Sequence, residues 1–298
     1  MIMKAIVKFI GLLLLISACK NSPQIDHISI GADRFITIDI EKGARITSFT
    51  LGDYEAIVSE LDNPNYYGST AWPAPQSDWD WPPPQALDAL AYTRNAEKEK
   101  LYHSAVDSAL QISMTKEIKL LPEDRVEITY GIKNKGSTSY QVGAWEVTRV
   151  NTGISFFPVD SLMVMEESNL PGIEIEKNVA WCTYSEELHP VGGKKYFESG
   201  KEGWLAHLND NVLFLKTYDD ISPHQVPPSH GEIEIYTQAD KPSYTELEIH
   251  GPYVSLEPGH SCTMTVRWKL YEVPTNIRTL DREELLTWVR NLVIKQKG

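Results

Sequence analysis

The chain carries little positive charge for its length. Its 298 residues include 28 lysines and arginines against 41 aspartates and glutamates, which gives a formal net charge of −13. Nucleic acids and anionic lipid surfaces are bound by clustered cations, which this balance does not supply. The composition therefore argues against a nucleic-acid partner and leaves small neutral ligands open.

Motifs of several enzyme classes are also absent from the sequence. There is no phosphate-cradling glycine loop and no alternation of strands with helices, which disfavours a nucleotide-binding α/β fold. There is no G-x-S-x-G elbow, which argues against an α/β-hydrolase. The histidines lack the H-x-x-x-H or H-x-H spacing of metal ligands, so we predict no dedicated zinc site and no cofactor. The histidines in question are His189, His207, His224, His230 and His260.

Cysteine is scarce, with three in the chain. Two of them, Cys182 and Cys262, can form a bridge in an oxidising compartment, but no spacing rule links them. Strict alternation through Ser261–Tyr271 places Cys262 on the apolar face of a strand, which predicts a buried core position. The sequence leaves the pairing of these two thiols open.

The N-terminus has the pattern of an export signal. Lys4 and Lys8 precede an apolar run, Phe9–Ile16, that is too short to span a bilayer, and small residues follow it. One interpretation of this pattern is ordinary secretory cleavage near Ala18, which would leave a soluble protein.

Residues 16–19, Ile-Ser-Ala-Cys, resemble the bacterial lipobox. This motif predicts removal of residues 1–18 and acylation of Cys19, with residues 19–26 as a lipidated tether to the membrane. Lys20 and Asn21 follow without the aspartate of an inner-membrane retention signal. We therefore expect an outer-membrane lipoprotein, on the periplasmic side rather than the cell surface.

Period-two patterns dominate the rest of the chain and indicate half-buried strands. Apolar residues alternate with polar ones in residues 36–40, 110–114 and 126–132. A turn at Asn209–Asn211 lies between two such runs and predicts a hairpin, so the pairing should be antiparallel.

The C-terminal segment, residues 275–298, is the part that is firmly helical by pattern. Its apolar residues recur at helical spacing, and Asp281 with Glu284 can form a capping box. No repeat or break in composition divides the residues before it. We predict one all-β domain at residues 27–274, followed by this helix.

The segment Gly68–Pro84 holds Trp72, Trp79 and Trp81 between prolines. Because prolines fix φ and remove backbone donors, we expect neither a helix nor a central strand here, but a packed surface loop. Flat indole faces beside Asp78 suit the C–H faces and hydroxyls of a sugar. The alternative is a loop whose tryptophans plug the edge of a sheet.

Two further segments carry titratable side chains. In Thr245–His250, the alternation puts Glu246, Glu248 and His250 on one face. If this face is sheltered, it can supply a general base. The alternative is that the acidic face is solvated. In residues 145–149, Trp145, Glu146 and Arg149 are candidate ligand contacts, and the last two can equally form an ion pair.

Several segments together resemble the galactose mutarotase-like, or aldose 1-epimerase-like, superfamily. They are Gly43–Phe49 with Gly52–Ile57, Tyr130–Asn134, and Glu246–Glu248 followed by Leu256–His260. The Trp72–Pro75 and Trp81–Pro83 motifs are similar to those of an uncharacterised bacterial family within it. The likeness covers residues 30–273.

The resemblance implies a β-supersandwich whose concave sheet holds a sugar, with a glutamate as base and a histidine as acid. Glu246 matches the base, but Trp145-Glu146 stands where the catalytic histidine is expected, and Trp72 lies near the place of a second, ligand-positioning histidine. We therefore expect a lipid-anchored, carbohydrate-interacting protein without ordinary mutarotase chemistry. The alternative is a structural or assembly lipoprotein that binds a protein partner.

Overall fold

A computed structural model describes residues 24–98, 100–159, 168–189, 191–277, 279 and 281–297. The expected export signal, Cys19 and most of the expected tether lie outside this part. Within the described residues, strands predominate, and no helix is long and apolar enough to cross a membrane. The predicted all-β fold with a C-terminal helix is confirmed.

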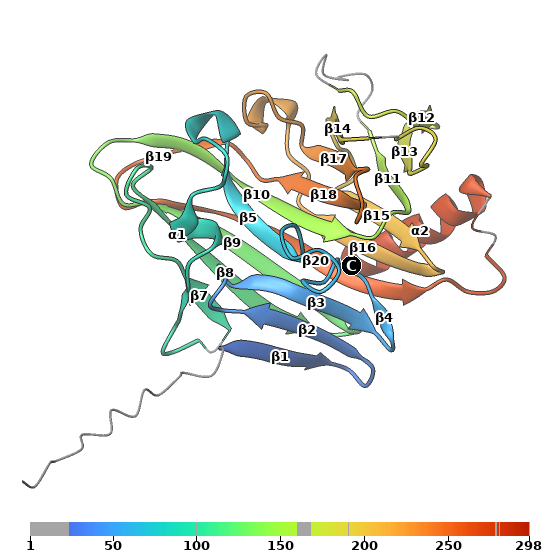
Figure 1. Cartoon of the computed structure of the whole chain (residues 1–298), viewed down its shortest axis with the longest axis horizontal. Coiled ribbons are helices and arrows are strands. Elements are labelled where there is room, and N and C mark those ends of the chain that lie inside the picture. Colours follow the sequence, from blue (N-terminus) through green and yellow to red (C-terminus); the bar gives the residue numbers. More distant parts are fainter. Residues whose placement is uncertain are drawn as a thin grey trace, which may run out of the picture.

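Two ten-stranded antiparallel sheets pack face to face (Figure 1). The first has the order β1 (Ile25–Ile30), β2 (Arg34–Asp39), β3 (Arg45–Leu51), β5 (Ser69–Ala74), β10 (Tyr140–Val150), β18 (Tyr244–His250), β17 (Ile233–Gln238) and β14 (Gly193–Glu198). Two short strands extend it, β4 (Tyr54–Glu55) on β3 and β19 (Val254–Leu256) on β10.

The second sheet runs through the remaining strands. Its order is β12 (Ile173–Glu176), β13 (Val179–Thr183), β11 (Ile154–Pro158), β15 (Trp204–Asn209), β16 (Val212–Tyr218), β20 (Ser261–Glu272), β9 (Arg125–Asn134), β8 (Ile112–Leu121), β7 (Leu101–His103) and β6 (Thr93–Arg94). The predicted hairpin is present as β15 and β16, joined at Asn209–Val212.

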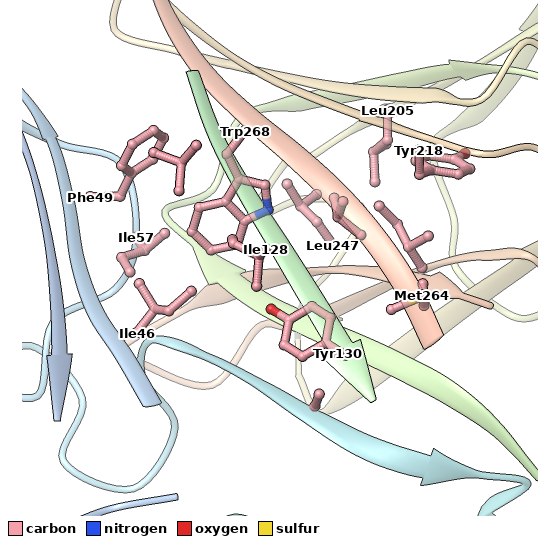
Figure 2. Packing of buried hydrophobic residues seen from close by; sticks show 14 of the residues in the cluster. Ile46, Phe49, Ile57, Ile128, Tyr130, Leu205, Tyr218, Leu247, Met264 and Trp268 are labelled. Atoms are coloured by element: carbon pink, nitrogen blue, oxygen red, sulfur yellow. The ribbon is translucent and has the colours of Figure 1, made fainter. Parts of the chain in front are cut away.

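Period-two alternation fills the space between the sheets with apolar side chains (Figure 2). Leu247 of β18 projects inward from the first sheet, and Trp268 of β20 projects inward from the second. The Trp268 ring lies 5.4 Å from Phe49 and 5.1 Å from Phe214, centroid to centroid. Burying each such aromatic side chain contributes about 1.5–3 kcal/mol, so this layer holds the two sheets together.

Helix α2 (Arg282–Lys297) covers the opposite face of the second sheet. Its buried residues Leu285 and Val289 pack with Leu213 and Leu215 of β16, whose alternate positions face away from the central core. Asp281 caps the helix, because its Oδ1 accepts from the Glu284 amide at 3.2 Å. The remaining helical pieces are short: α1 (Gln85–Asp88), η1 (Gln76–Asp78) and η2 (Pro223–Gln225).

The two cysteines of the described residues are free thiols, one buried (Cys182) and one half-buried (Cys262). Cys262 packs against the edge of the central core, so its side chain faces inward as predicted without being fully enclosed.

The prediction that Gly68–Pro84 holds no central strand is wrong. Residues Ser69–Ala74 form β5, a fully buried strand between β3 and β10. Pro73 is tolerated because β5 pairs with β3 only at Ser69, so at Pro73 only the ladder with β10 is present. The rest of the segment, from Pro75 on, is loop and a single 3₁₀ turn.

Candidate functional site

A pocket of about 360 Å³ opens on the outer face of the first sheet, the face turned away from the second sheet. Neighbouring strands β5, β10, β18, β17 and β14 each place alternate side chains on this face. Six aromatic residues line the pocket: Tyr66, Trp72, Trp81, Trp145, Tyr236 and Tyr244. Four polar residues complete it: Gln76, Lys195, Gln238 and Glu246.

Hydrogen bonds fix the orientation of the indole rings. Trp72 donates its Nε1–H to Asp88 Oδ1 at 2.9 Å, and Trp145 donates to Glu248 Oε2 at 2.8 Å. The two rings meet edge to face, 5.0 Å between centroids. Trp81 meets the Trp72 ring edge to face at 5.8 Å and is 53% exposed, so it forms the outer wall of the pocket.

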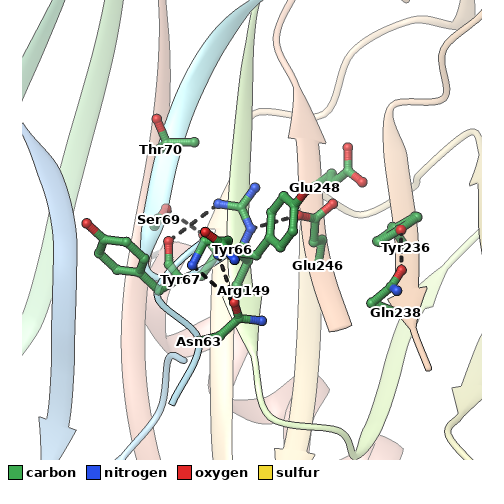
Figure 3. Close-up of polar contacts among 12 residues, drawn as sticks. Asn63, Tyr66, Tyr67, Ser69, Thr70, Arg149, Tyr236, Gln238, Glu246 and Glu248 are labelled. Carbon is green, nitrogen blue, oxygen red and sulfur yellow. Dashed lines mark hydrogen bonds and ion pairs between the residues drawn. The ribbon is translucent and has the colours of Figure 1, made fainter. Parts of the chain in front are cut away.

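Glu246 is held by the guanidinium of Arg149, its partner across the β10–β18 pairing (Figure 3). Arg149 Nε lies 2.8 Å from Glu246 Oε1, and the guanidinium also lies over the Trp72 ring at 5.7 Å. Burial acts to lower the pKa of Arg149, but Glu246 and smaller contributions from Tyr244 and two further carboxyl groups together raise it overall. Arg149 therefore stays charged and orients the carboxylate that lines the pocket.

Lys195 reaches the pocket from β14 and lies over the Trp145 ring at 4.9 Å. Its Nζ lies 2.5 Å from Glu234 Oε2 and 2.8 Å from Glu248 Oε2. Burial acts to lower the pKa of Lys195, but the two carboxyl groups raise it overall. The pocket wall thus presents a fixed ammonium group.

The two carboxyl groups that share this ammonium group have pKa values shifted in opposite directions. Burial raises the pKa of Glu248 well above its usual range, and Glu234 and Glu246 add to the rise although Lys195 opposes it. Burial also acts to raise the pKa of Glu234, but Lys195 and His250 bring it well below the usual range. The pKa values of these two buried carboxyl groups are thus shifted in opposite directions, so the ionised form is favoured more at Glu234 than at Glu248.

His230, Glu234 and His250 bring one ligand atom each to within 4.8 Å of one another, as three metal ligands would. However, the backbone N–H of Gln76 donates to His230 Nε2 at 3.1 Å. A neutral ring that accepts at Nε2 carries its proton on Nδ1, which lies 2.8 Å from Glu234 Oε1. A metal needs a lone pair on that nitrogen. The cluster is therefore a hydrogen-bonded network that holds Glu234 and, through it, Lys195.

The structure brings part of the predicted site together. Trp72, Trp81, Trp145 and Glu246 line the pocket. Trp79 packs behind them, with its Nε1 donating to Pro73 O at 2.9 Å.

Three other predicted residues lie outside the pocket lining. Glu248 and His250 lie beneath Trp145, and the His250 ring stacks on that indole at 5.1 Å. Burial lowers the pKa of His250 to about 4, although Glu234 opposes this shift. Asp78 is exposed and accepts from Tyr140 OH at 2.8 Å.

The structure contradicts one predicted ligand contact. Glu146 points into the space between the sheets, because Trp145 and Arg149 occupy the outer face and alternation turns Glu146 inward. Its carboxylate lies 2.8 Å from Lys216 Nζ and accepts from Trp268 Nε1 at 3.1 Å. Glu146 and Arg149 therefore do not pair with each other, and Glu146 is a core residue.

Several residues in and around the pocket are not among those predicted from the sequence. Alternation in Ile233–Gln238 places Glu234, Tyr236 and Gln238 on one face, and this signal was available. Lys195 had no local signal, because its partners lie on strands far along the chain.

Comparisons with known proteins fit this architecture. A family model described as a domain of unknown function, DUF4380, matches residues 52–271. The chain belongs to the DUF4380 family. A search of the curated proteins gives no match for this DUF4380 member.

Solved structures similar to this DUF4380 protein share its fold at low sequence identity. A putative aldose 1-epimerase from Escherichia coli K12 is 10% identical, with a TM-score of 0.56 over 85% of this chain and 100% of its own. A galactose mutarotase-like protein from Lactobacillus casei is 11% identical, with a TM-score of 0.57 over 83% and 100%. A galactose mutarotase related enzyme from Lactobacillus acidophilus is 11% identical, with a TM-score of 0.58 over 85% and 100%. The fold is therefore galactose mutarotase-like.

Proposed function

We propose that this protein binds a carbohydrate in the pocket on the outer face of the first sheet. The observation that carries the proposal is the combination of six aromatic side chains with four polar ones around a single pocket. Aromatic faces stack on the C–H faces of a sugar ring, while carboxylate, amide and ammonium groups bind its hydroxyls. The names of the similar structures, an epimerase and mutarotase-like proteins, agree with a sugar ligand.

Charge at the pocket wall favours a neutral sugar. Glu246 and Lys195 contribute one charge of each sign to the lining, and both are already paired within the protein. The volume of about 360 Å³ lies at the small end of ligand pockets, which suits one sugar residue of a longer chain or a free monosaccharide.

The site supports binding better than ordinary mutarotation. Ring opening needs one group to deliver a proton and another to remove it. Lys195 holds its proton because its pKa is raised, and the carboxylate of Glu246 is engaged in an ion pair with Arg149. Trp145 stands where the resemblance places the acid histidine, so we propose a sugar-binding role, or chemistry on an uncommon sugar, without glucose or galactose mutarotation.

Isothermal titration with a panel of mono- and oligosaccharides tests the proposal. We expect saturable binding of at least one sugar, weakened about three- to tenfold by Trp81→Ala, because one stacking face is lost. Trp81 is exposed, so the variant should fold. The matched control is Phe35→Ala, an aromatic residue that is 45% exposed on β2. No binding across the panel would favour the structural role with a protein partner.

We also propose that the protein is attached to the outer membrane through a lipid on Cys19, as the lipobox predicts. The acidic composition supports a lipid anchor over electrostatic membrane binding, because clustered cations are needed for the latter. The Trp72–Pro75 and Trp81–Pro83 motifs border the pocket, and we propose that they mark a subfamily that shares this site.

A further inference from the structure

A second cavity opens at the end of the first sheet, separate from the sugar pocket. Its volume is about 150 Å³, and it lies where β14 ends and β17 begins. Two carboxyl groups, Glu198 and Glu232, line it together with the Ser199 hydroxyl. Its apolar wall is made of Pro223, Val226 and Pro227.

Both carboxyl groups are fully buried, and in the described part of the chain neither forms an ion pair with a cation. Glu198 accepts from Tyr196 OH at 2.7 Å and from the Ser199 amide at 2.8 Å. Glu232 accepts through Oε1 from the Ile221 amide at 2.9 Å. Burial raises the pKa of both groups, that of Glu232 to about 8, because these hydrogen bonds offset only part of the cost of burying the ionised form.

Two polar atoms in this cavity lack a hydrogen-bond partner in the described residues, although both are buried. They are Glu232 Oε2 and Ser199 Oγ. His230 also lines the cavity, but its two nitrogens are engaged by Glu234 and the Gln76 amide. Buried polar atoms are nearly always paired, so two orphan oxygens in one cavity indicate a missing donor.

The backbone is shaped to let the carboxyl groups approach. A Cβ at Gly200 would lie 2.6 Å from Glu232 Oε2, and a Cβ at Gly231 would lie 2.6 Å from the Glu198 amide nitrogen. Glycine at both positions therefore allows the ends of the two strands to close around the cavity. This arrangement is a built site rather than an accidental gap between loops.

We propose that this cavity binds a primary ammonium group on a short alkyl stem. An ammonium group has three N–H donors and one positive charge, which match Glu232 Oε2, Ser199 Oγ and the Glu198 carboxyl group once Glu232 has released its proton to the solvent. The two prolines and the valine of the wall contact the methylene groups of the stem. The site binds a cation and is independent of the sugar pocket.

A divalent metal ion fits this cavity less well. Calcium takes about six to eight oxygen ligands, and magnesium about six. Both oxygens of Glu198 already accept hydrogen bonds, and the three apolar wall residues offer no side-chain oxygen. An ammonium group needs only three acceptors, so the observed oxygen atoms suffice for it.

Isothermal titration of the full chain with n-butylammonium tests the proposal. Two probes of similar size serve as comparators: n-butanol lacks the charge, and butyltrimethylammonium lacks the N–H donors. We expect saturable binding of n-butylammonium and at least tenfold weaker binding of both comparators. Equal binding of butyltrimethylammonium would overturn the assignment of N–H donors to the ligand.

Variants locate the site. Glu232→Gln should weaken n-butylammonium binding at least tenfold, and Ser199→Ala several-fold, while Glu257→Gln removes an exposed carboxylate and should leave binding unchanged. Circular dichroism confirms that each variant is folded. The proposal fails if Glu232→Gln and Ser199→Ala both bind n-butylammonium as tightly as the wild type does. It also fails if calcium binds the wild type more tightly than n-butylammonium does and it is calcium binding that Glu232→Gln abolishes.

Discussion

Two charged side chains of the proposed sugar pocket are paired with neighbours of opposite charge. Glu246 is paired with Arg149, and Lys195 is placed between Glu234 and Glu248. The ammonium group of Lys195 can donate to hydroxyls but releases its proton poorly, because the two carboxyl groups beside it raise its pKa. The charged side chains of the pocket therefore favour binding over proton transfer.

We expect no acceleration of the mutarotation of fresh α-glucose or α-galactose above the buffer rate, measured by polarimetry. Glu246→Gln should instead weaken sugar binding about tenfold or more, because hydrogen bonds to charged groups contribute about 1.5–3 kcal/mol. Glu257→Gln is the matched control, since it removes an exposed carboxylate. Rapid mutarotation that Glu246→Gln abolishes would restore the mutarotase interpretation.

The buried ion pair between Glu146 and Lys216 is a second residue-scale test. Burial lowers the pKa of Lys216 although Glu146 opposes it, and the two side chains are 0% exposed. Lys216→Met leaves Glu146 without its cation and should lower the free energy of unfolding by about 3–5 kcal/mol, measured by urea denaturation. The double variant Glu146→Gln/Lys216→Met should recover most of this loss. A loss below about 1 kcal/mol in the single variant would contradict the argument.

Glu232 predicts a pH dependence of stability. Its pKa rises from 4.5 to about 8 on folding, so between these values the unfolded chain is ionised while the folded chain keeps the proton. Stability contributed by this group is complete below pH 4.5 and falls by about 1.4 kcal/mol per pH unit up to pH 8. Glu232→Gln should therefore show a shallower decline of unfolding free energy over this range. Identical slopes in wild type and variant would exclude a raised pKa.

At the scale of elements, alternation decides what each strand contributes. Strand β10 sends Trp145 to the pocket and Glu146 to the core, and its Arg149 lies on the same outer face as Trp145, where it holds Glu246. Helix α2 uses the same logic at helical spacing, with Leu285 fully buried against the second sheet and Ile294 69% exposed. One face of each element is thus committed to packing, and the other is free for function or solvent.

Leu285→Ala should lower the free energy of unfolding by about 2–5 kcal/mol, because it removes a buried side chain and leaves a cavity. Ile294→Ala on the same helix should change it by less than about 0.5 kcal/mol. Thermal and denaturant unfolding of both variants provides the measurement. Similar effects of the two substitutions would mean that α2 does not pack as described.

At the scale of the whole molecule, the proposed attachment to the membrane depends on a lipid on Cys19. Cys19→Ala should move the protein from the membrane to the soluble fraction, because acyl chains would be its hold on the membrane. Fractionation with radiolabelled palmitate measures this, and Cys262→Ala is the matched control. Label that remains on the Cys19→Ala protein would contradict lipidation at this residue.

Local pattern by itself determined which side chains of a strand share a face. The inward positions of Leu247 and Ile249 and the outward positions of Glu246, Glu248 and His250 follow from period two alone. The turn at Asn209–Asn211 predicted the antiparallel hairpin, and helical spacing predicted the C-terminal helix. These features depend on residues that are neighbours in the chain, so the sequence carries them directly.

Only the tertiary structure decided which outward faces meet. Lys195 and Glu248 are 53 residues apart, and their contact depends on the order β18–β17–β14 and on the register of each pair. Likewise, Pro73 could enter a central strand only because β3 stops pairing before it. Strand order and register are set by the summed packing of the whole core, which no local pattern contains.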